Sequence, residues 1–166
     1  TDGDNNFILQ NYKMYYYKEN HSVAHEYSIK IHDYLTGKIA DAQKNKKKAK
    51  SLEDFGNVQF YNGQLEELFS VRKYLTDQID LDTHKYYNWC IKRNKMAYIY
   101  LLNLHEKIDK KLIEAKKNVD TASSEPEKIK FIQGRIQVLS EFKEFLNNNL
   151  NSKLPRRIRK RFKENQ

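Results

Sequence analysis

The chain has 166 residues, of which 31 are Lys or Arg and 22 are Asp or Glu, so its formal net charge is +9. This length suits one domain or two very small ones, and it excludes a large multidomain enzyme. Only 5 Gly and 2 Pro are present, too few for a turn-rich β-sandwich or a Gly-rich phosphate-binding loop. We therefore expect an all-α fold.

The first long amphipathic pattern predicts a helix over residues 23–45, and a related pattern recurs over 96–118 at a constant offset of 73. Seven of the 23 aligned positions are identical, several times the chance level. We interpret the two segments as copies of one helix. The identical pairs are Ala24/Ala97, Tyr27/Tyr100, His32/His105, Lys38/Lys111, Ala42/Ala115, Lys44/Lys117 and Asn45/Asn118.

A second helix is predicted to follow in each copy, where the match resumes at an offset of 71. Gly63 and Gly134 lie at equivalent points of this helix, although a glycine there costs about 1 kcal/mol relative to alanine. We expect a close backbone crossing at these glycines, with Ala24 and Ala97 as candidate partners. The other identical pairs are Phe60/Phe131, Leu68/Leu139 and Leu75/Leu146.

Each copy is therefore interpreted as a helical hairpin, and the two hairpins are expected to pack into a pseudo-twofold four-helix arrangement. Neither hairpin can bury both its faces alone. The predicted units cover residues 1–82 and 83–152, and a basic tail covers 153–166. Loops are expected over 46–54 and 119–125.

Two local patterns complete the helical prediction. Ser124 is expected to be the N-cap of the last helix, with Pro126 in its first turn. Glu66 and Glu67 belong to a pattern of acids and lysines that is typical of a solvated helix face. These carboxylates are therefore not expected to form an acid/base pair.

The histidines and the single thiol are weak candidates for chemistry. His21 and His25 have the i, i+4 spacing of a shared metal site, but Asn94 and Tyr98 replace them in the second copy. Cys90 lies in an apolar helical stretch, where a thiol is inert. We expect no metal, no cofactor and no enzymatic activity.

The cysteine content and the apolar runs also indicate a compartment. One cysteine cannot form an internal disulfide, which favours a reducing environment. The apolar runs are too short for a membrane span. We therefore expect a cytoplasmic protein with no membrane partner.

Aromatic residues interleaved with basic ones precede both predicted long helices. They could stack on nucleic-acid bases beside a basic surface. They could equally hold the two hairpins together as half-buried side chains. Both interpretations remain open for Tyr15, Tyr16, Tyr17, Tyr86, Tyr87 and Trp89.

Most of the excess charge lies in the tail. Residues 153–166 hold seven cations and one acid, so they carry +6 and leave +3 to residues 1–152. Arginine, the better bidentate partner for phosphate, is concentrated there. Solvated segments, nucleic acid and an acidic protein surface are all compatible with such basic runs. The candidate polyanion-binding residues are Lys153, Arg156, Arg157, Arg159, Lys160, Arg161 and Lys163 in the tail, and Lys46, Lys47 and Lys48 at the first hairpin tip.

These features favour a non-enzymatic helical protein that binds nucleic acid or a nucleoprotein machine through its tail and hairpin tip. No recognition-helix motif accompanies the basic residues, so we expect phosphate contacts without sequence readout. The alternative is a protein–protein interaction module, such as a phage- or plasmid-encoded factor that modulates host transcription or replication proteins. High Lys, Asn, Tyr and Ile content is typical of an A+T-rich genome.

Overall fold

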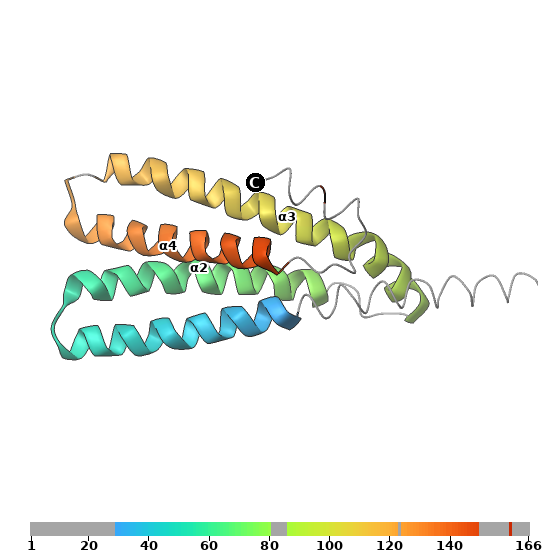
Figure 1. Ribbon diagram of the computed structural model, residues 1–166, viewed down its shortest axis with the longest axis horizontal. Coiled ribbons are helices and arrows are strands. Elements are labelled where there is room, and N and C mark those ends of the chain that lie inside the picture. Colours follow the sequence, from blue (N-terminus) through green and yellow to red (C-terminus); the bar gives the residue numbers. More distant parts are fainter. Residues whose placement is uncertain (1–28, 81–85, 123, 150–159, 161–166) are drawn as a thin grey trace, which may run out of the picture.

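The computed structural model describes residues 29–80, 86–122, 124–149 and Lys160, with side chains described outside 78–102. Every element in these ranges is an α-helix. The first helix covers residues 29–51 and is followed by α2 (Phe55–Asp80), α3 (Tyr86–Thr121) and α4 (Pro126–Asn148). Figure 1 shows the four helices side by side along the long axis, with both hairpin turns at the same end. The predicted all-α fold of two hairpins is confirmed.

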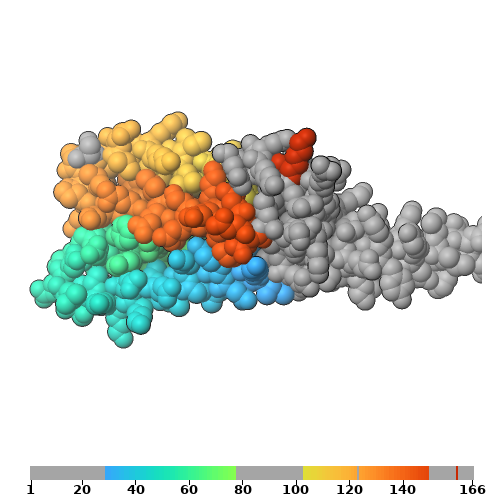
Figure 2. Space-filling view, viewed as in Figure 1, coloured from blue at the N-terminus to red at the C-terminus, as the bar shows by residue number. Residues whose placement is uncertain are grey.

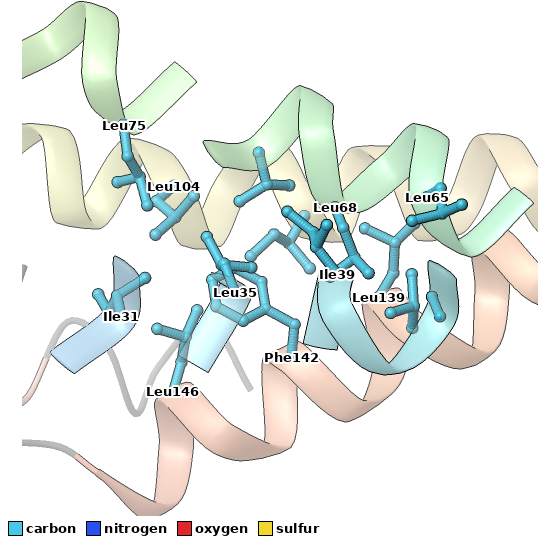
Figure 3. Close-up of a cluster of buried hydrophobic side chains, with 14 of the residues drawn as sticks. Ile31, Leu35, Ile39, Leu65, Leu68, Leu75, Leu104, Leu139, Phe142 and Leu146 are labelled. Atoms are coloured by element: carbon cyan, nitrogen blue, oxygen red, sulfur yellow. The ribbon is translucent and has the colours of Figure 1, made fainter. Parts of the chain in front are cut away.

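The two copies bury equivalent side chains. Ile31 and Leu35 of the first helix are completely buried, and their counterparts Leu104 and Ile108 in α3 are at most 1% exposed. Side chains from all four helices meet in one hydrophobic cluster (Figure 3). The duplicated sequence pattern therefore produces one shared core. The buried pairs of α2 and α4 are Leu68/Leu139, Val71/Phe142 and Leu75/Leu146.

An aromatic cluster distinguishes the α4 side of this core. Phe142 occupies the place where the first copy has the smaller Val71, and both are buried. Tyr34 of the first helix stacks on Phe145, with ring centroids 4.0 Å apart and an interplanar angle of 15°. Burial raises the pKa of Tyr34 to about 12. The first helix is thereby packed against α4 as well as against α2.

The closest approach between the hairpins is at the two predicted glycines. A methyl group added to Gly63 would overlap the carbonyl oxygen of Phe131, and one added to Gly134 would overlap that of Phe60. The same offset of 71 relates the two glycines and the two phenylalanines, so one contact occurs twice about the pseudo-twofold axis. The predicted close crossing is confirmed.

The partner of this crossing differs from the expectation. The glycines face the backbone of the opposite second helix, where we had expected Ala24 and Ala97; Ala24 and the side chain of Ala97 lie outside the described residues. The reason is that α2 and α4 lie against each other, whereas the first helix and α3 use longer side chains to reach α4 and α2. Lys38 of the first helix reaches Glu141 of α4, for example, with 3.3 Å between Nζ and Oε2.

The second hairpin turn is shorter than expected. The helix α3 continues to Thr121, so residues 119–121, which were expected to begin the loop, belong to the helix. Glu125, and not Ser124, is the N-cap of α4, and it makes no side-chain capping hydrogen bond. Its carboxylate instead pairs with Lys128 at 2.9 Å. Pro126 begins α4 as expected, since its fixed φ suits a first turn.

Candidate functional site

The structure describes part of the predicted binding surface. Lys46, Lys47 and Lys48 are described in full, and Lys160 is helical and exposed. The boundaries of the predicted units also fall outside the described ranges and remain predictions. The candidates whose side chains lie outside the described residues are Tyr15, Tyr16, Tyr17, Tyr86, Tyr87, Trp89, Lys153, Arg156, Arg157, Arg159, Arg161 and Lys163.

The basic run at the first hairpin tip is helical. The first helix continues through residue 51, so the expectation of a loop from residue 46 is wrong. Lysine and alanine have high helix propensity, and cations are stabilised near the negative C-terminal end of a helix. The lysines are therefore held on a regular scaffold.

Two of these lysines and Lys44 form a ridge on the first helix, and Lys44 also lines one of the cavities described below. Lys44, Lys47 and Lys48 are spaced i, i+3 and i+4, which places them on one helix face. Buried Ala42 and Ala49 mark the opposite, core-facing side. All three ridge lysines are exposed, and we refer to them as the lysine ridge.

The lysine ridge makes no described ion pair, and its nearest acid on the same helix is the exposed Asp41, one turn before Lys44. The ion pairs of the described residues engage other cations, and none of them reaches Lys44, Lys47 or Lys48. Figure 2 shows this tip as the cyan end of the first hairpin, uncovered on the face in view. Three ammonium groups are thus presented together to solvent, an arrangement suited to a polyanion.

A tight turn joins the ridge to α2. Glu53 N–H donates to Lys50 C=O at 3.1 Å, and Asp54 N–H donates to Ala49 C=O at 2.9 Å, the two bonds of a Schellman motif. Glu53 has a φ of 54°, a left-handed conformation that normally favours glycine. An Asp54 carboxylate oxygen accepts Asn57 N–H at 3.3 Å and caps α2. The tip is therefore well ordered by its own hydrogen bonds.

Two large apolar side chains at this turn were missed by the sequence analysis. Leu52 is 69% exposed and Phe55 is 62% exposed, one on each side of the Glu53–Asp54 apex. Both lie within eight residues of the lysine ridge. The sequence does indicate their exposure, because neither side chain fits the periodic pattern of apolar positions that is buried in α2 from Val58 onward.

The second hairpin tip has different chemistry. Residues 119–121 are Val-Asp-Thr where the first copy has Lys46, Lys47 and Lys48. At the position of Phe55, the offset of 71 places Pro126. The second tip therefore has neither the lysine ridge nor the exposed aromatic ring, and it is a natural internal control for the first.

Two cavities lie in pseudo-equivalent places between the hairpins. One, of about 510 Å³, is lined by Phe131, Ile132 and Arg135 among others. The other, of about 380 Å³, is lined by the counterparts of these residues in α2 and by side chains of the first helix and α4. Both linings mix acids with cations, so neither presents a convergent site for one class of ligand.

A buried carboxylate connects three helices away from the tips. Glu67 is 3% exposed, so the expectation of a solvated position is wrong, whereas its neighbour Glu66 is exposed as expected. It accepts hydrogen bonds from Lys111 Nζ at 3.0 Å and from Arg135 Nε at 2.8 Å. These partners are 44 and 68 residues away in the sequence. With both oxygens occupied by cations, Glu67 is a structural anchor rather than a general base.

Of the repeat-equivalent histidines, His105 is buried and His32 is half-buried. Burial lowers the pKa of His105 to about 4, with Asp109 opposing and Lys143 reinforcing the shift. Burial also lowers the pKa of His32, and Arg72, the counterpart of Lys143, acts in the same direction. Both histidines are therefore predominantly neutral at pH 7, and His105 is the more strongly perturbed.

The described ranges hold neither a candidate metal site nor a membrane-spanning helix. No group of three or more His, Cys, Asp or Glu side chains there could hold a metal ion. Nor does any helix there have the length and apolarity needed to cross a bilayer. His21 and His25 lie outside the described residues.

No known protein family, curated protein or solved structure is significantly similar to this chain. The candidate site therefore rests on its own geometry. It consists of the lysine ridge and the exposed apolar pair at the first hairpin tip.

Proposed function

We propose that the protein is a non-enzymatic nucleic-acid-binding protein and that the first hairpin tip is part of its binding surface. The observation that carries the proposal is the lysine ridge, three exposed lysines on one helical face that make no described ion pair. Nucleic acids offer closely spaced phosphates, and their neutralisation releases condensed counterions.

The C-terminal tail is the second element of the proposal. Residues 153–166 carry +6, and Lys160 is exposed. Arg156, Arg157 and Arg159 would add guanidinium groups that bind phosphate through two parallel hydrogen bonds. Tip and tail together would hold the ligand by its backbone, without reading sequence. The single cysteine supports placing this activity in a reducing compartment such as the cytoplasm.

The salt dependence of binding tests the contribution of the ridge. In a variant with Lys44, Lys47 and Lys48 replaced by Gln, the slope of log K against log salt should fall by about 2–3 units, since each phosphate contact contributes about 0.7–0.9. The measurement is fluorescence anisotropy with labelled DNA and RNA over a series of salt concentrations. Replacement of Arg156, Arg157, Arg159 and Arg161 by Gln tests the tail separately.

The second tip supplies the matched control. Lys116 and Lys117 are exposed lysines near the end of α3, and their replacement by Gln changes the net charge without touching the ridge. We expect a smaller effect on the slope. An equal effect would reduce the tip to a source of general positive charge, and unchanged slopes in both the ridge and tail variants would overturn the proposal. A host protein retained after nuclease treatment would instead favour the interaction module.

A further inference from the structure

The first hairpin tip combines two kinds of surface that the second tip lacks. Leu52 and Phe55 are more than 60% exposed, and they follow Lys48, the last lysine of the ridge, by four and seven residues. Only three other large apolar side chains among the described residues are exposed, and they are scattered over the first helix, α2 and α3. Phe69 and Ile113 also have basic neighbours, so what distinguishes the first tip is the presence of two exposed apolar side chains at one turn that follows a basic run.

The position of Phe55 is not required by the fold. It is the first residue of α2, and the buried stripe begins three residues later at Val58. The capping of α2 is provided by Asp54, whose carboxylate holds Asn57 through two hydrogen bonds. A ring that contributes neither to the core nor to the cap is free to contact a ligand.

We propose that this tip prefers single-stranded nucleic acid to duplex. In this arrangement, Phe55 stacks on an unpaired base beside Leu52, and the lysine ridge neutralises phosphates of the same strand. A single strand offers unstacked base faces to an aromatic ring, whereas a duplex conceals them in its base stack. The proposal rests on the proposed function, because it specifies the form of nucleic acid that the same site takes.

The spacing of the ridge fits one strand. A helix rises about 1.5 Å per residue, so Lys44 lies about 5 Å along the axis from Lys47 and Lys48. The ridge ends at Lys48, and the tight turn leads from there to Phe55. A strand that follows the first helix with its phosphates can thus place a base against the ring at the tip.

The turn disfavours an anionic membrane as the partner. Glu53 and Asp54 lie at the apex between the two apolar side chains, and both are exposed. Insertion of Leu52 and Phe55 into a bilayer would bring these two carboxylates to the lipid surface, where they would be repelled and desolvated. A base that stacks on the face of the Phe55 ring leaves the carboxylates of Glu53 and Asp54 in water.

The test uses the full chain with an oligothymidine strand and with its duplex formed with oligoadenine, by fluorescence anisotropy. We expect the wild type to bind the single strand more tightly. Phe55→Ala should weaken binding to the single strand by about fivefold or more, a modest value for one lost stacking contact, and should leave duplex affinity and the salt slope unchanged. Phe55→Tyr should restore binding. Ile113→Ala, at an exposed apolar position of α3, is the control and should have no effect.

The outcomes separate this inference from the proposed function. If single strand and duplex bind equally and Phe55→Ala affects neither, the inference is overturned while a ridge-dependent salt slope still supports nucleic-acid binding. If neither nucleic acid binds, both proposals fail. Tighter binding to phosphatidylserine vesicles, or a nuclease-resistant protein partner that is lost with Phe55→Ala, would also overturn the inference. Circular dichroism of each variant shows whether the fold is kept.

Discussion

The first and second hairpins share most of their buried positions but differ at their tips. Gly63 and Gly134 make the same backbone crossing in opposite directions, and the buried positions of the two copies match. At the tips, however, Lys46, Lys47 and Lys48 correspond to Val-Asp-Thr. Burial therefore constrains the same positions in both copies, whereas the residues of a solvated turn can differ between them.

Some contacts between the hairpins occur at equivalent positions but involve different side-chain types. Tyr34 stacks on Phe145, and at the pseudo-equivalent place the Lys107 ammonium lies 4.5 Å from the ring centroid of Tyr74. One contact is aromatic stacking and the other is a cation–π interaction. The geometry set by the helices therefore tolerates different side-chain chemistries.

The largest loss of stability is expected from substitutions at the glycine crossing that both hairpins share. Gly63→Ala and Gly134→Ala should each lower the free energy of unfolding by about 3 kcal/mol, because the new methyl group would meet backbone that no side-chain rotation can move. Urea unfolding followed by circular dichroism measures this. Gly37→Ala is the matched control, since nothing lies within 4 Å of its added methyl group, and it should stabilise the first helix by up to about 1 kcal/mol. Tolerance of alanine at either crossing glycine would contradict the close approach.

A second variant addresses a difference in the interior. Glu67 has Val138 as its counterpart, so the first hairpin alone supplies the buried carboxylate. Glu67→Gln should lower the free energy of unfolding by about 2 kcal/mol, because Lys111 and Arg135 lose their counter-charge while partly buried. Glu141→Gln, which breaks the half-exposed pair with Lys38, should cost less than about 1 kcal/mol. Equal losses in both variants would show that burial does not separate the two pairs.

The two repeat-equivalent histidines are expected to differ in how strongly they make stability depend on pH. The pKa of His105 is lowered from 6.5 to about 4, so the unfolded chain binds a proton at this residue more readily than the folded one. Its stabilising effect is complete above pH 6.5 and is lost as the pH falls toward 4. Between pH 7 and pH 5 the loss should be about 1–2 kcal/mol.

His105→Gln should remove that part of the pH dependence. The His32→Gln variant should change it less, since His32 is only half-buried. Both effects are read from urea unfolding at the two pH values. The same pH dependence in wild type and His105→Gln would exclude His105 as its source.

The smallest effect concerns the first turn, where Glu53 adopts the only positive φ of a non-glycine residue within the described ranges. Glu53→Gly should raise the free energy of unfolding by about 0.5–1 kcal/mol, because glycine adopts this conformation without a Cβ clash. Thermal unfolding of Glu53→Gln separates backbone from charge. If Gln stabilises as much as Gly, the charge at the tip and not the left-handed conformation is responsible.

Sequence analysis predicted the fold more completely than the site. Periodicity and repeat matching identify positions such as Leu35 and Ile108, because burial in a helix imposes a regular spacing. They placed the tip lysines in a loop, since a basic run has no apolar period to show that the helix continues. They also assigned Glu67 to the solvent, because the cations that bury it come from α3 and α4.

The sequence by itself determined the duplication, the helical hairpins, the shared core stripe and the existence of a glycine crossing. Each of these depends on local periodicity or on comparison of the chain with itself. Only the tertiary structure decided that Gly63 meets Phe131, that Glu67 is buried between two cations, and that Phe55 is exposed at the first hairpin tip. These three features depend on which surfaces the helices cover when they pack, and this information is not contained in the spacing of residues along one helix.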